Sequence, residues 1–141
     1  MAEPSHWEHF PHEADIGIRG IGSSREQAFE QAAMALTAAV CDPASVRPRE
    51  SLPIQCLGED DELLFVNWID ALIFEMSTRK MLFSGFDVHI DGRSLAAIVR
   101  GEPIDLARHR PAAEVKGATL TALRVTQRPD GFWLAQCVVD V

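Results

Sequence analysis

Asp15 and the three histidines before it are the first residues in the chain whose types and spacing could do chemistry. His6, His9 and His12 precede Asp15 at intervals of three, a spacing that would place all four side chains on one face of a helix. Pro11 argues against that helix, because proline lacks a backbone N–H and clashes with the preceding turn. A structural zinc site also normally has four Cys or His ligands. We therefore discount a helix-borne zinc site here.

The residues after Asp15 instead predict a strand. Ile16 and Ile18 alternate with Gly17 and Arg19, which is typical of a half-buried strand. An aspartate at the entrance of such a strand is either a turn or cap residue, or an oxygen ligand and base. From this segment alone the turn or cap is favoured, because most carboxylates have no functional role.

A second carboxylate lies at the far end of the sequence. Asp140 is the penultimate residue and stands beside the carboxylate of Val141. If the last strand pairs near the start of the first, Asp15, Asp140 and this carboxylate converge. Hard oxygen donors without nitrogen or sulfur select a cation such as Ca²⁺ or Mg²⁺.

Other kinds of chemistry have little support in the sequence. Cys41, Cys56 and Cys137 are odd in number and lack a Cys-x-x-Cys pair, which argues against a disulfide framework or a zinc knuckle and favours a reducing compartment. Their apolar surroundings are typical of inert thiols. No Walker loop, Gly-x-Gly-x-x-Gly or Gly-x-Ser-x-Gly motif is present, so no nucleotide or hydrolase chemistry is indicated.

Composition bounds the class of protein. The 141 residues, 47% hydrophobic and 24% charged, predict one globular domain spanning 1–141. The net charge of −8 argues against direct nucleic-acid binding and suits a metal cation or a basic protein partner. The sequence shows neither a signal peptide nor an apolar run long enough to span a membrane, so we expect a cytoplasmic protein without a membrane anchor.

Two helices are predicted. Ser23 or Ser24, followed three residues later by Glu26 or Gln27, marks the start of the first, which ends before Pro43. The second should cover about 60–78 and be buried on nearly every side. Its polar residues Asn67 and Asp70 are interpreted as a solvated stripe in preference to a contact toward a site.

The remaining elements are strands and loops. We expect an edge strand at 52–57, a hairpin of 86–90 with 95–99, a long surface loop at 101–111, and two long strands at 114–128 and 131–141. This order predicts an α+β fold with two helices packed on one face of a mixed, largely antiparallel sheet of about six strands.

Five segments, in order, resemble the archease family. Residues 12–17, His-Glu-Ala-Asp-Ile-Gly, are similar to its His-Thr-Ala-Asp-Ile-Gly opening, and 63–74 resemble its second helix. Residues 101–109 are similar to its central loop, 114–119 to its Val-Lys-Ala-x-Thr strand, and 138–141 to its terminal Asp-Ile. Glu13 departs from the family's threonine, and Gly117 with Leu120-Thr121 departs from its alanine and aromatic-His pair.

The resemblance implies a function for the chain. Archeases are accessory proteins of the RtcB-type RNA ligase of tRNA splicing or RNA repair; they promote guanylylation of the ligase histidine and multiple turnover, while the ligase itself uses GTP and Mn²⁺. It also implies a bound Ca²⁺, with Mg²⁺ or Mn²⁺ as alternatives, on Asp15, Asp140 and Val141. We expect a monomer that is not itself an enzyme.

Two further expectations remain open from the sequence. The possible partner contacts are His12, Glu13, Asp70, Asp105, Arg108, His109 and Lys116, although surface solubility explains the basic ones equally well. The alternatives in function are a stand-alone metal-dependent phosphohydrolase, with His12 or His109 as base, or an interaction module that the metal only stabilises.

Overall fold

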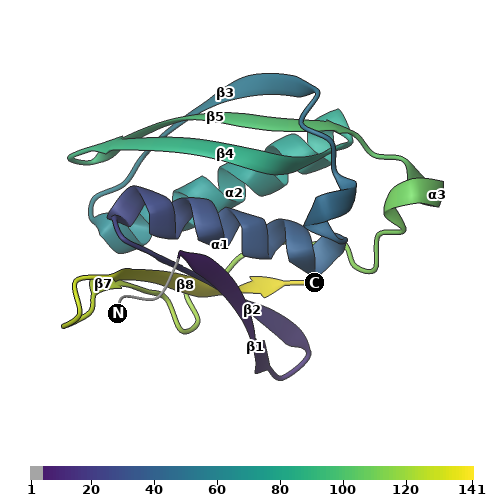
Figure 1. The fold of residues 1–141 in the computed structure, drawn as a ribbon. Coiled ribbons are helices and arrows are strands. Elements are labelled where there is room, and N and C mark those ends of the chain that lie inside the picture. The colour runs from purple at the N-terminus through teal and green to yellow at the C-terminus, as the bar shows by residue number, and fades with distance from the viewer. Residues whose placement is uncertain (1–4) are drawn as a thin grey trace.

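Within residues 5–141, which the computed structural model describes, two antiparallel sheets enclose two long helices (Figure 1). The larger sheet has the order β1-β2-β8-β6 with β7 also paired to β8, and the smaller has the order β3-β5-β4. The larger sheet contains β1 (His6–His12), β2 (Asp15–Gly22), β6 (Gly117–Ala118), β7 (Arg124–Gln127) and β8 (Trp133–Asp140). The smaller contains β3 (Glu50–Leu57), β4 (Met81–Asp91) and β5 (Ser94–Pro103), and the helices are α1 (Arg25–Val40), α2 (Asp61–Arg79), α3 (Leu106–His109) and a 3₁₀ turn, η1 (Pro43–Ser45).

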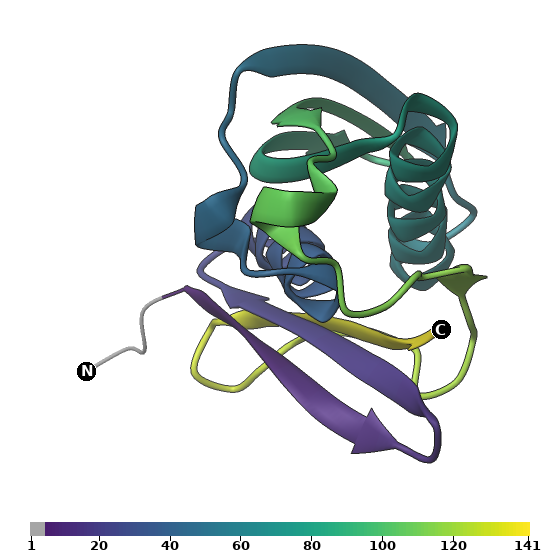
Figure 2. The ribbon, with the colours of Figure 1, turned by 90° about the vertical axis from the view of Figure 1, so that its right-hand side faces the viewer.

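The predicted α+β class is confirmed, but its arrangement differs from the prediction. The single mixed sheet is wrong, because the strands divide between two sheets and every described pair is antiparallel. The helices lie between these sheets and not on one face of one sheet (Figure 2). Hydrophobic alternation shows which face of a strand is buried, but it does not show which sheet the strand joins.

Helix α1 is built to be covered on both sides. Ser24 caps its N-terminus by accepting the Gln27 N–H at 3.1 Å, as the capping signature predicts. The helix packs on β2 and β8 on one side and on β4 on the other, and its many buried alanines allow this close approach. β2 and α1 come very close at Gly20, where a Cβ would lie only 2.0 Å from the Ala28 carbonyl oxygen, so only glycine fits there.

Helix α2 covers the span predicted for it but is not buried on every side. Asp60 caps it by accepting the Leu63 N–H at 2.8 Å, and the fully buried Trp68 donates its indole N–H to the Phe29 carbonyl at 3.1 Å. Phe74, however, is 61% exposed. The outer face of α2 therefore carries Phe74 together with the exposed Asn67 and Asp70.

The strands largely follow the prediction, with three differences. β3 is an edge strand. β4 and β5 form the predicted hairpin, with Gly92 and Arg93 in its turn, although both strands are longer than expected. The span 114–128 is two short strands, interrupted by a turn in which Ala122 has φ 54°. β1 is a strand not expected from the sequence, and it is an edge strand, where Pro11 is tolerated.

None of the helices in residues 5–141 combines the length and apolarity that crossing a membrane requires. Residues 1–4, on which the expectation of no signal peptide partly rests, lie outside the described residues.

Candidate functional site

The turn between β1 and β2 holds Asp15 at the edge of the larger sheet. His12 pairs with Asp15 across this hairpin, and Glu13, in the turn between them, has φ 54°. Glycine or asparagine usually occupies this left-handed conformation, because a Cβ is strained there. The turn therefore presents a charged side chain two residues before Asp15, at some conformational cost.

Strand β8 brings the end of the sequence to the same edge. β2 and β8 are antiparallel and pair Ile16 with Val139, so the next residues along, Asp15 and Asp140, follow at the neighbouring ends of the two strands. The Val141 N–H donates to Oδ1 of Asp15 at 3.3 Å. The strand pairing that the sequence prediction required is thus present. We call Asp15, Asp140 and Val141 the carboxylate edge.

Strand β6 connects this edge to α2. The Lys116 N–H donates to the Asp140 carbonyl at 2.7 Å, and Gly117 pairs with Asp140. The Ala118 N–H donates to Oδ1 of Asp70 at 2.8 Å. Asp70 is exposed, as predicted for a solvated stripe, but its carboxylate also fixes β6 to α2. Of the expected partner contacts, His12, Glu13, Asp70 and Lys116 therefore lie along elements that meet at or next to the carboxylate edge.

The donors at the carboxylate edge fit a hard cation. They are oxygens of carboxyl groups, Asp15 is half-buried and Asp140 is exposed, and only Oδ1 of Asp15 has a hydrogen-bond partner among the described residues. Within residues 5–141, no group of three or more His, Cys, Asp or Glu side chains gathers to form a cation site. A Ca²⁺ ion would take six to eight oxygens, and Asp15, Asp140 and Val141 are the residues of this edge that would supply them.

The histidines before Asp15 do not form a cluster. His6 pairs with Glu8 at 2.9 Å, whereas Nε2 of His9 lies 2.8 Å from the Ala35 carbonyl of α1. The two rings thus leave the strand on different sides, as expected for an extended segment. Burial raises the pKa of Cys56 to about 11 and that of Cys137 to about 12, so these thiols stay protonated and inert, as predicted.

The remaining partner candidates, Asp105, Arg108 and His109, lie elsewhere. The expectation of a long surface loop at 101–111 is wrong, because β5 continues to Pro103 and a one-turn helix, α3, follows. The Glu102 and His109 side chains are only 5% and 0% exposed. A buried imidazole is not available as a partner contact, nor as a base acting at the carboxylate edge.

Glu102 is the centre of a buried polar cluster that the sequence did not reveal. Its carboxylate accepts hydrogen bonds from the Arg47 N–H at 2.8 Å, from Arg108 at 2.7 Å and from Nε2 of His109 at 3.0 Å. The Asp105 N–H donates to Nδ1 of His109 at 2.8 Å, so the imidazole proton is on Nε2. We call Glu102, Arg108 and His109 the Glu102 cluster.

The Glu102 cluster is electrostatically complete. The Arg47 N–H, followed by Arg108 and His109, lowers the pKa of Glu102 to about 2, despite the opposing effect of burial. Arg108 also donates to the Ser45 carbonyl at 2.6 Å, which joins α3 to η1. Since each group already has a partner, this arrangement fixes the 104–110 segment in place.

Comparison with known proteins identifies relatives over nearly the whole chain. Residues 7–141 match the Archease protein family. The chain is 38% identical over 139 residues to the protein archease of Pyrococcus abyssi and 37% identical to that of Thermococcus gammatolerans, each match covering 96% of this chain and 98% of the relative. The solution structure of Methanobacterium thermoautotrophicum protein 1598 superimposes with a TM-score of 0.83 at 32% identity, covering 96% of this chain and 98% of that one.

Proposed function

Because the chain belongs to the archease family, we propose that it is an accessory protein of an RtcB-type RNA ligase and not itself an enzyme. It promotes guanylylation of the ligase histidine, for which the ligase uses GTP and Mn²⁺, and it sustains multiple turnover in tRNA splicing or RNA repair. It acts in the cytoplasm as a monomer and does not bind RNA directly.

The observation that carries this proposal is the link between Asp15 and Val141. It joins residues 126 positions apart and places Asp15 and Asp140 at one accessible edge of the sheet. A net charge of −8 favours docking against a basic surface, and the RNA-binding cleft of a ligase has that character. His12, Glu13, Asp70 and Lys116 provide further contacts around the edge, and the exposed Asp105 provides a separate one.

We propose that Asp15, Asp140 and Val141 hold a Ca²⁺ ion, for which Mg²⁺ or Mn²⁺ can substitute. When bound, this cation supplies positive charge between the ends of β2 and β8. Glu13 adds a carboxylate beside the ion, and hard cations favour sites with more negative charge. The coordination positions that the chain leaves open are available to water or to the ligase.

Guanylylation of the cognate ligase tests the proposal. The assay combines ligase, GTP and Mn²⁺ with substoichiometric wild-type protein, Asp15→Ala or Asp140→Ala. Wild type should accelerate guanylylation and both variants should lose most of that effect. Asp87→Ala removes an exposed carboxylate from the other sheet and should behave as wild type.

Circular dichroism of each variant checks that it is folded. Absence of any acceleration by folded wild-type protein would refute the proposal. Hydrolysis of nucleotides or phosphoesters by the purified protein alone would replace it with the enzymatic alternative.

A further inference from the structure

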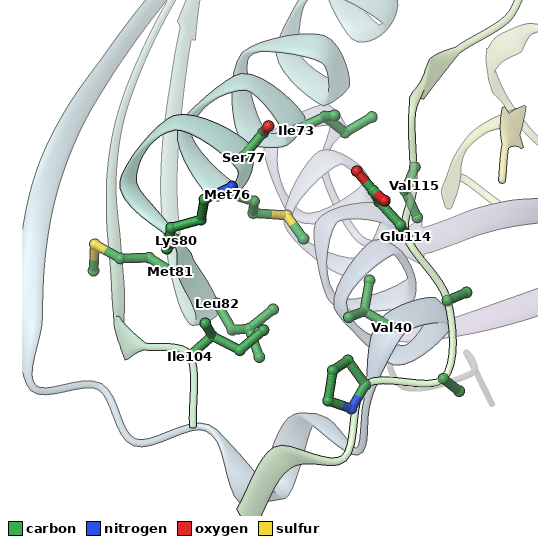
Figure 3. A pocket seen from close by; sticks show the side chains of 13 residues that line it. Val40, Ile73, Met76, Ser77, Lys80, Met81, Leu82, Ile104, Glu114 and Val115 are labelled. Atoms are coloured by element: carbon green, nitrogen blue, oxygen red, sulfur yellow. The ribbon is translucent and has the colours of Figure 1, made fainter. Parts of the chain in front are cut away.

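A cavity of about 450 Å³ opens between the C-terminal half of α2 and the segment 111–115 (Figure 3). Val40 at the end of α1 and Leu82 of β4 lie at its base, and Ile73, Met76, Ile104 and Val115 contribute further apolar walls. This volume lies within the range of ligand-binding pockets, which are also mostly apolar. None of the residues placed at the carboxylate edge lines the cavity.

The segment 111–115 has the character of an unpaired strand. Its side chains alternate, with Ala112 and Glu114 exposed and Ala113 and Val115 more buried. It is fixed at both ends, because the Ala112 N–H donates to the Val40 carbonyl at 2.8 Å and the Lys116 N–H donates to the Asp140 carbonyl at 2.7 Å. Between these anchors, the backbones of residues 113–115 make no hydrogen bond with any part of residues 5–141.

An unpaired extended backbone is a template for another strand. Such a segment offers a row of N–H and C=O groups that an incoming extended chain can complete. Figure 2 shows the segment crossing the molecule from α3 toward β6, at the surface of the protein. A peptide pairing there would run along the mouth of the cavity and could insert apolar side chains into it.

Opposite charges stand on the two walls of the mouth. Lys80 ends α2 on one side, and Glu114 belongs to the segment on the other (Figure 3). Neither side chain forms an ion pair with a group in residues 5–141. Lys80 also has φ 54° at the helix C-terminus, where glycine is the usual residue.

We propose that this cavity and the backbone of 113–115 bind a short extended segment of a partner protein. The segment pairs its backbone with 113–115 and buries an apolar side chain in the cavity. An acidic residue of the segment pairs with Lys80 on one wall, and a basic residue pairs with Glu114 on the other. The unpaired backbone favours a peptide over a lipid, because a lipid would leave those N–H and C=O groups without partners.

Two capped peptides, acetyl-Lys-Val-Leu-Val-Glu-amide and acetyl-Glu-Val-Leu-Val-Lys-amide, test the proposal on the full chain without any ligase. Failure here would therefore leave the proposed ligase function untouched. Binding should shift the NMR amide signals of Ala113, Glu114 and Val115, and calorimetry should show a preference for one peptide. Two exposed ion pairs correspond to a preference of about threefold to tenfold.

Two controls separate charge recognition from backbone pairing. The double variant Lys80→Glu with Glu114→Lys exchanges two exposed charges, so it should fold normally and prefer the other peptide. A version of the preferred peptide with N-methyl groups at its apolar residues should lose binding, because it cannot donate backbone hydrogen bonds.

Three results would overturn the proposal: no shifts at 113–115, equal binding of the N-methylated peptide, or an unchanged preference in the double variant. Displacement of the peptide by decanoate, at a decanoate concentration below that of the peptide, would also overturn the proposal and assign the cavity to a lipid.

Discussion

The Glu102 cluster and the carboxylate edge both contain carboxylates, but those carboxylates differ in burial and in the number of hydrogen bonds they accept. In the cluster, a carboxylate accepts three hydrogen bonds and lies beneath the surface. At the edge, Asp15 accepts one hydrogen bond from Val141, and Asp140 is exposed. A carboxylate whose partners are all internal holds the chain together, whereas one with open lone pairs is free to bind something else.

This contrast separates residues that the sequence presents as equivalent. His12 and His109 both belong to the segments that resemble the family, and both are candidates for partner contacts. His109 is enclosed by Glu102 and Asp105, whereas His12 flanks the turn beside Asp15. Only the fold distinguishes a structural histidine from one that a partner can reach.

The largest effect should come from opening the Glu102 cluster. His109→Ala leaves a cavity and removes a donor from the buried Glu102, so we expect a loss of about 3 kcal/mol in unfolding free energy. Urea denaturation measures it. His109→Gln, whose amide can still donate, should lose less, and His89→Ala, at an exposed ring, should lose almost nothing. Equal stability of His109→Ala and wild type would mean that the cluster is not structural.

Low pH should weaken the Glu102 cluster in the wild-type protein, because it protonates Glu102. The pKa of Glu102 is about 2 in the folded protein, below its ordinary value of 4.5. A depressed pKa stabilises the fold fully above the unfolded value, and this contribution is lost as pH falls from about 4.5 toward 2. Stability of wild type should therefore fall toward that of Glu102→Gln across this window. A constant difference between the two proteins down to pH 2 would contradict the assignment.

Cation binding at the carboxylate edge should raise the unfolding free energy by slightly less than the amount that His109→Ala removes. A Ca²⁺ concentration 100 times the dissociation constant adds about 2.7 kcal/mol to the folded state. Thermal unfolding with Ca²⁺ or with chelator measures this difference in wild type, and Asp140→Asn should abolish it. His109→Gln should keep it, because the cluster lies apart from the edge. An equal Ca²⁺ effect in Asp140→Asn would remove Asp140 from the proposed site.

The smallest effect should come from the strained turn. Glu13→Gly relieves a left-handed backbone and should raise stability by about 1 kcal/mol when Ca²⁺ is absent. The same change removes a carboxylate beside the ion, so Ca²⁺ affinity should fall. Glu13→Asn, which tolerates this conformation without the charge, should lower affinity equally. Unchanged affinity in both variants would show that the charge of Glu13 has no part in the site.

The sequence predicts the helices and the meeting of the two chain ends better than it predicts the rest. The capping residue Ser24 and the apolar periodicity are local signals, so they mark α1 and α2 correctly. The sequence also predicts that Asp15 and Asp140 lie close together, because each borders a strand with clear hydrophobic alternation. Division into two sheets depends on long-range pairing, and local patterns do not contain it.

The Glu102 cluster was missed for a related reason. Glu102 and Arg108 look like surface residues in the sequence, and the largest contribution to the lowered pKa comes from the Arg47 backbone N–H, which no side-chain pattern reports. The interruption of 114–128 was also missed, because the turn at Ala122 uses a residue that carries no turn signal.

The place of β8 in the larger sheet has a consequence for how the molecule is made. β8 is the last strand of the chain, yet it pairs with β2, β6 and β7. β2 is synthesised more than a hundred residues before β8, and until β8 is made, the edge of β2 that pairs with it has no partner. Pairing over such sequence distances is slow, and an open edge invites aggregation meanwhile. Asp15 and Val141 can therefore meet only after β8 has joined β2 in the larger sheet.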